Sequence, residues 1–116
     1  MSIRPCGEIG DTSWAYEERS FIMKDSPINK LQQLMVITAE ECGELTQRCS
    51  KIIRKYKKFS EIEDDQRNKL LEEVGDVYCM IDLMCDHNVL DWKHIYARSS
   101  AKKEKLKKWS TLIDDK

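Results

Sequence analysis

Two short acidic segments have almost the same pattern, and they are the residues that point most directly to chemistry. The first reads Glu-Glu-Cys-Gly-Glu-Leu over 40–45, and the second reads Glu-Glu-Val-Gly-Asp-Val over 72–77. Residues three apart on an α-helix are neighbours, so each segment projects two carboxylates from one face. Like charges at this spacing destabilise a helix, so both pairs need something that offsets the repulsion. The pairs are Glu41 with Glu44 and Glu73 with Asp76.

A divalent cation would offset this repulsion. Carboxylate oxygens suit Mg²⁺, with Mn²⁺ as a substitute, and four of them from two packed helices can hold one or two ions while leaving positions open for water and phosphate. Each segment also contains a glycine, Gly43 or Gly75, although glycine within a helix costs about 1 kcal/mol relative to alanine. This predicts close approach of a helix or a ligand. A solvated acidic face is the alternative for either segment alone, but the repeated pattern favours a metal site.

Basic residues follow the first acidic segment on the same helical row. A metal-bound phosphate at the glutamates would therefore meet cations one and two turns further along the helix. Cations near a helix C-terminus are also favoured by the helix dipole, and both roles can hold together. The row changes from apolar to acidic to basic through Leu34, Ile37, Glu41, Glu44, Arg48, Lys51 and Lys55, and its last three members are candidate phosphate ligands.

The first of these segments lies in a long predicted helix. Asp25-Ser26-Pro27 has the composition of a helix start, and the helical period continues to about Phe59. Steps of three and four predict one apolar stripe that faces the core. The stripe consists of Ile28, Leu31, Met35, Thr38, Cys42, Leu45, Cys49, Ile52, Tyr56 and Phe59.

A second helix is predicted from Ile62 to Asn88, with Ser60 and Glu63 at capping-box spacing and Asn88 as the C-terminal cap. This helix is apolar on nearly every side, which is typical of a central helix in a bundle or an oligomer. Asp82 is embedded in it, either beside a cation or at an exposed corner.

Asp91 can cap a third helix with apolar residues at helical spacing and a crowd of basic ones. The basic residues form either a solvated face or a surface that reaches phosphate, and Lys102 is the candidate ligand among them. Residues 1–26 are predicted to be an N-terminal arm. Its Trp14 would either cover a substrate base or pack on the bundle.

The composition predicts one soluble, cytoplasmic domain over residues 1–116. The net charge is −1 with 35% charged residues, so no global field points to nucleic acid or membrane. No apolar run is long enough to span a bilayer. Five cysteines without a CxxC motif predict buried, reduced thiols. We therefore expect an all-α helical bundle, built on two long helices plus shorter terminal helices and completed as a homodimer or homotetramer.

The two acidic motifs resemble the signature of the MazG-like superfamily of all-α nucleoside triphosphate pyrophosphohydrolases, in particular small single-domain bacterial and phage members. The similarity covers about residues 28–90, including Ser50-Lys51 after the first motif and Leu71 before the second. It implies that Mg²⁺ binds to Glu41, Glu44, Glu73 and Asp76. It also implies hydrolysis between the α and β phosphates of a (d)NTP, giving a (d)NMP and pyrophosphate, as nucleotide-pool housekeeping.

The acidic and basic residues described above are chemically suited to that reaction. Mg²⁺ neutralises developing charge and lowers the pKa of a bound water, and a carboxylate, Glu41 or Glu40, can take the proton as the base. The cations beyond the motif would stabilise the leaving pyrophosphate. Two alternatives are a phosphoribosyl-ATP pyrophosphohydrolase-like enzyme, which would use the same carboxylates, and a non-catalytic helical oligomerisation module, which would need no metal.

Overall fold

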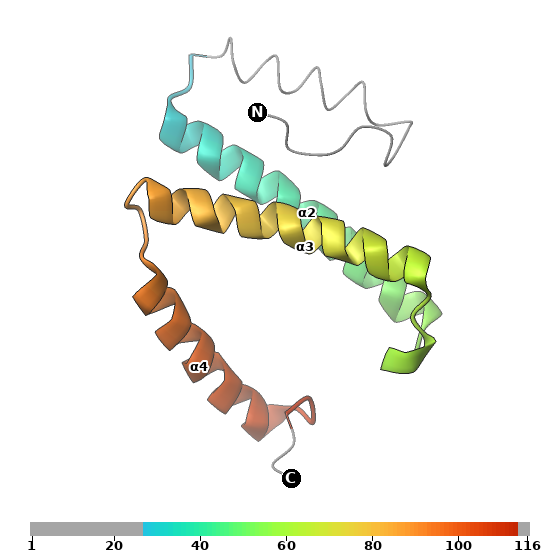
Figure 1. Ribbon diagram of the computed structural model, residues 1–116. Helices are drawn as coiled ribbons and strands as arrows, with labels where there is room; N and C mark the ends of the chain where they lie inside the picture. The colour runs from blue at the N-terminus through green and yellow to red at the C-terminus, as the bar shows by residue number, and fades with distance from the viewer. Residues whose placement is uncertain (1–26, 114–116) are drawn as a thin grey trace. The chain divides into compact units, whose positions relative to one another are not determined.

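The computed structural model describes residues 27–113, and in that part of the chain the fold is all-α, as predicted. Three α-helices and one short 3₁₀ helix follow one another, and residues 27–113 contain no strand (Figure 1). The predicted N-terminal arm and its Trp14 lie outside the described residues. The elements are α2 (Lys30–Lys55), η2 (Phe59–Glu61), α3 (Asp64–Asp86) and α4 (Trp92–Trp109).

Helix α2 begins later and ends earlier than the sequence predicted. Its N-cap is Asn29, whose side chain accepts a hydrogen bond from the backbone N–H of Gln32 at 2.8 Å, while the Gln32 side chain accepts from the Asn29 N–H at 3.0 Å. This reciprocal capping box satisfies two backbone donors at once, so the helix starts here rather than at Pro27. The chain turns to extended geometry at Tyr56, so the predicted end at Phe59 was also wrong.

The turn between α2 and α3 is held by glutamates in roles that the sequence did not predict. The Ser60–Glu63 capping box is not formed among the described residues. Instead, Glu61 accepts hydrogen bonds from the two backbone N–H groups before η2, at 2.9 and 3.2 Å. Glu63 accepts from Lys55 Nζ at 3.0 Å and from the Tyr56 hydroxyl at 2.8 Å. These bonds tie the end of α2 to the start of α3.

Side-chain contacts show that α2 and α3 run antiparallel with a seven-residue register (Figure 1). Arg48 of α2 donates to Gln66 of α3 at 3.0 Å. Glu41 lies seven residues before Arg48 on α2, and Glu73 lies seven residues after Gln66 on α3. The carboxylates of these two glutamates also approach each other. A seven-residue repeat keeps one face of each helix towards its partner. Another seven residues along each helix lie Leu34 on α2 and Met80 on α3. They are 8% and 1% exposed, so both are buried.

The predicted core stripe of α2 is therefore not the buried face. Leu31, Met35 and Phe59 are 55%, 40% and 81% exposed, and Cys42 and Cys49 are also exposed, against the prediction of buried thiols. The buried residues of α2 come instead from the neighbouring, partly charged row, because that row carries the contacts to α3. They are Leu34, Ile37, Glu41 and Arg48.

The chain divides after Ile81 into two compact units. In the second unit, Asn88 has a φ of 61°, the left-handed geometry that lets Asn end a helix, so the predicted cap is confirmed. Asp91 caps α4 by accepting from the His94 backbone N–H at 2.9 Å, also as predicted. Asp82 is exposed. No helix within residues 27–113 combines the length and the apolar character needed to cross a membrane.

Candidate metal centre

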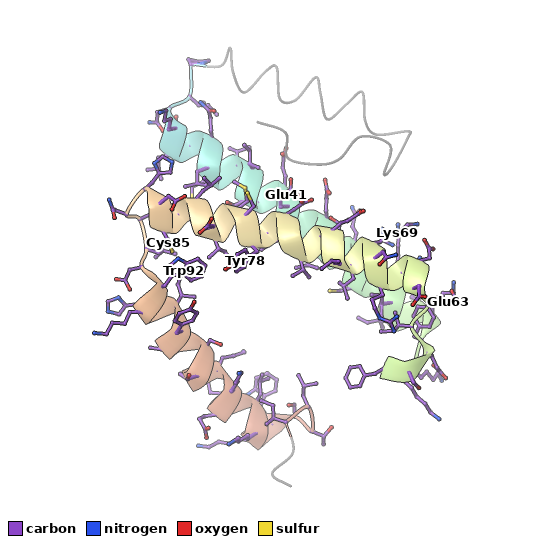
Figure 2. All side chains as sticks on the ribbon, in the orientation of Figure 1. Glu41, Glu63, Lys69, Tyr78, Cys85 and Trp92 are labelled. Atoms are coloured by element: carbon purple, nitrogen blue, oxygen red, sulfur yellow. The ribbon has the colours of Figure 1, made fainter. Side chains whose placement is uncertain are left out.

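The antiparallel helices α2 and α3 form a helical hairpin, and three carboxylates from the two helices converge in its middle. Glu41 comes from α2, and Glu73 and Asp76 come from α3, three residues apart on one face. One carboxylate oxygen from each lies within 4.8 Å of the other two. In Figure 2, Glu63 marks the turn between α2 and α3, and Glu41 lies on α2 far from that turn. The structure thus joins the two acidic motifs across the helix pair.

The spacing is close to what a Mg²⁺ ion needs. Oxygens on opposite sides of an octahedral Mg²⁺ are about 4 Å apart, since each Mg–O bond is about 2.0–2.1 Å. Adjacent oxygens are only about 3 Å apart by the same geometry, so oxygens that lie within 4.8 Å of one another would have to move closer to bind one ion. Coordination by carboxylate and water oxygens suits Mg²⁺ or Mn²⁺ better than a softer metal.

The two glutamates of this group are deeply buried. Glu41 is 1% exposed and Glu73 is 3% exposed. Charged carboxylates are seldom buried so deeply, because removing them from water costs several kcal/mol unless a counter-charge or hydrogen bonds compensate. The two most buried acidic groups of the described chain are thus members of the predicted metal site.

Other predicted acidic residues lie beside this group rather than in it. Glu44 was expected as the fourth metal ligand, and it is half-buried one turn beyond Glu41 but outside the converging trio. Glu40 was expected as an alternative base and is half-buried next to Glu41. The structure therefore brings together three of the four predicted ligands.

The predicted phosphate-binding cations fall into different environments. Arg48 is buried and donates to Gln66, whereas Lys51 is exposed. Lys55 is exposed but bonded to Glu63, and this hydrogen bond is the main reason why the pKa of Lys55 is raised and that of Glu63 is lowered. In the other unit, the exposed Lys102 lies with its Nζ 5.1 Å from the centre of the Trp109 ring.

Gln66 is the site-adjacent residue that the sequence reasoning missed. It stands on α3 seven residues before Glu73, just as Arg48 stands on α2 seven residues after Glu41. This equal spacing was visible in the sequence, but it becomes meaningful only when the two helices are known to be antiparallel and in that register. The contact between the two residues therefore had to come from the structure.

Comparison with known proteins adds no relative to this picture. No family model matches the chain, and neither a curated protein nor a solved structure does. Functional assignment therefore depends on the residues and their arrangement.

Proposed function

We propose that this protein is a Mg²⁺-dependent nucleoside triphosphate pyrophosphohydrolase that converts a (d)NTP and water into a (d)NMP and pyrophosphate. One observation carries the proposal. The carboxylates of two separate acidic motifs, Glu41 from one and Glu73 and Asp76 from the other, meet within 4.8 Å between antiparallel helices. The resemblance of the same motifs to the MazG-like superfamily supplies the reaction class.

In this proposal the chain's own residues hold the ion and manage the proton. Bound Mg²⁺ would neutralise charge on the phosphates and acidify a water. Glu41, Glu73 and Asp76 bind the ion, and Glu44 is the fourth carboxylate one turn away. Because Glu41 already belongs to the converging group, the half-buried Glu40 beside it is the better candidate for the base that accepts the proton from water.

The substrate's phosphates require cations as well. Arg48, Lys51 and Lys55, which belong to the same unit as the carboxylates, are the proposed ligands for these phosphates. Lys102 lies in the other unit, and its phosphate-binding role stays a prediction from the sequence. The proposed role is nucleotide-pool housekeeping in the cytoplasm. A base-binding role for Trp14 is retained as a proposal. Lys55 is exposed but already bonded to Glu63, so this bond must break before Lys55 can bind a phosphate.

We also propose that a second copy of this chain covers the exposed apolar rows of the hairpin, giving a homodimer or homotetramer. Leu31 and Met35 on α2, and Leu71, Val74 and Tyr78 on α3, are 40–67% exposed in the single chain. Exposed apolar side chains that gather into one patch mark interaction sites. Two helical hairpins packed on such faces make a four-helix bundle.

The proposal is tested by an assay for pyrophosphate release on a panel of NTPs, dNTPs and phosphoribosyl-ATP, with Mg²⁺ titrated. We expect activity that requires Mg²⁺, and we expect Glu73→Gln and Asp76→Asn to lose both the activity and a Mg²⁺-induced rise in Tm. Asp82→Asn is the matched control, since Asp82 is an exposed acidic residue of the same helix.

The alternatives predict different results. A preference for phosphoribosyl-ATP would select that enzyme class. Nucleoside diphosphate and inorganic phosphate as products would show attack between the β and γ phosphates and contradict the proposal. A protein with neither activity nor a Tm response to Mg²⁺ would be an oligomerisation module.

A further inference from the structure

Arg48 is in an unusual environment for an arginine. Its side chain lies at the α2–α3 interface at 6% exposure. It donates one hydrogen bond, from Nη1 to the Gln66 side-chain oxygen at 3.0 Å. Its Nε–H is buried and, within residues 27–113, has no hydrogen-bond acceptor. Among the same residues, no carboxylate lies within ion-pair distance of the guanidinium.

An arrangement of this kind is costly if its only role is structural. A buried donor without an acceptor costs free energy, and a buried charge without a counter-charge costs more. Apolar residues of similar volume often replace buried charged groups with no loss of stability. A guanidinium in this environment therefore indicates an anion that residues 27–113 do not supply.

The neighbour of Arg48 points the same way. Gln66 accepts a hydrogen bond but carries no charge, so it orients the guanidinium without neutralising it. It occupies Nη1, which leaves the edge formed by Nε and Nη2 for another acceptor. An arginine edge with two parallel N–H groups binds phosphate in a bidentate manner.

Position along the helix relates this edge to the metal centre. Arg48 follows Glu41 by seven residues, about 10 Å along the axis at 1.5 Å per residue. Helical side chains tilt towards the helix N-terminus, which for Arg48 is the direction of Glu41. An anion that reaches both the ion and the guanidinium must therefore be extended, as a polyphosphate chain is.

We propose that Arg48, positioned by Gln66, is an oxyanion subsite for the pyrophosphate portion of a metal-bound polyphosphate. The proposal rests on the function proposed above and deepens it, because the subsite selects a polyphosphate chain over a nucleoside monophosphate. The subsite is closed in this structure, so entry of the anion requires the half-buried Gln66 side chain to shift together with the guanidinium.

The test is calorimetric titration of inorganic pyrophosphate into the full chain with Mg²⁺ present, using Arg48→Met and Gln66→Glu. The first variant removes the charge, and the second places a carboxylate against the guanidinium. We expect each to weaken pyrophosphate binding by roughly ten- to a hundredfold, as the loss of a hydrogen bond to a charged group predicts. Arg54→Met, at an exposed arginine of α2, is the control and should bind as the parent does.

Gln66→Glu separates anion binding from a structural role. A merely structural Arg48–Gln66 pair would become an ion pair in this variant, and Tm and pyrophosphate affinity would be maintained. The subsite predicts a maintained or higher Tm together with weak pyrophosphate binding. Binding of a nucleoside monophosphate and the Mg²⁺-induced rise in Tm should be unchanged in both variants.

The outcomes also separate the subsite from the proposed function. Pyrophosphate binding of parental strength in both variants, or no binding to the parent, would overturn the subsite even if NTPs are hydrolysed. Loss of pyrophosphate binding in the variants of a protein that hydrolyses no NTP would support the subsite and reject the proposed function.

Discussion

The glycines of the two acidic segments can be tested by replacement with alanine. The sequence predicted that Gly43 and Gly75 allow a helix or a ligand to approach closely. In the structure both are exposed, and a Cβ added at either position meets no described atom within 4 Å. The glycines therefore do not serve the contact between α2 and α3. Each alanine variant should gain about 1 kcal/mol of unfolding free energy from helix propensity alone.

That gain is large enough to measure. For a chain of 116 residues, about 1 kcal/mol corresponds to a rise in Tm of roughly 4–6 °C. Urea unfolding followed by circular dichroism at low protein concentration should show the same increase, and Ala39→Gly, at an exposed site of α2, should show a comparable loss. A lower stability of Gly43→Ala or Gly75→Ala in dilute protein would refute the reasoning, because it would mean that the space is filled. If a second copy uses this space, the variants will be more stable when dilute but will associate more weakly in sedimentation.

Three further predictions concern the hairpin itself. Met80→Ala should lower the unfolding free energy by about 2–5 kcal/mol in urea titrations, because Met80 is only 1% exposed. As the control, Ile53→Ala should change the unfolding free energy by no more than about 0.5 kcal/mol, because Ile53 is 76% exposed. The hydrogen bond from Lys55 lowers the pKa of Glu63 below its usual 4.5. The contribution of this bond to stability is therefore full above pH 4.5 and is lost as the pH falls through the lowered pKa of Glu63. Glu63→Gln should reduce this acid dependence in thermal melts. Asn29→Ala should cost about 1 kcal/mol and speed amide exchange in the first turn of α2, and unchanged exchange would contradict the capping role.

The helices could be predicted because their signals are local. Periodicity predicted the long helices, and the caps at Asn88 and Asp91 follow from short-range chemistry. The start of α2 was misplaced because several polar residues near it can cap, and the reciprocal bonds between Asn29 and Gln32 decide which of them does. In the same way, Glu63 has the spacing of a capping residue but bonds to Lys55 across the turn.

The site could be predicted within each helix but not between them. Helical spacing alone places Glu73 and Asp76 on one face. Their approach to Glu41 depends on the register of α2 against α3, and the contacts of Glu63 at the turn hold the two helices together near that end. A shift of a few residues would have moved Glu41 away from the carboxylates of α3. Arg48 would then also have lost its contact with Gln66.

The misassigned core of α2 has a physical explanation that bears on assembly. Choosing the most apolar row as the buried one assumes that a helix has one partner. Instead, α2 turns its partly charged row to α3, and the apolar row is partly exposed and partly half-buried. The proposed metal site is consistent with this arrangement, since Glu41 belongs to the row that faces α3. The apolar row then needs a different partner. Leu31 and Met35 are exposed on α2 and Leu71 on α3. The arrangement that contradicts the predicted core is therefore the observation behind the proposed second copy of the chain.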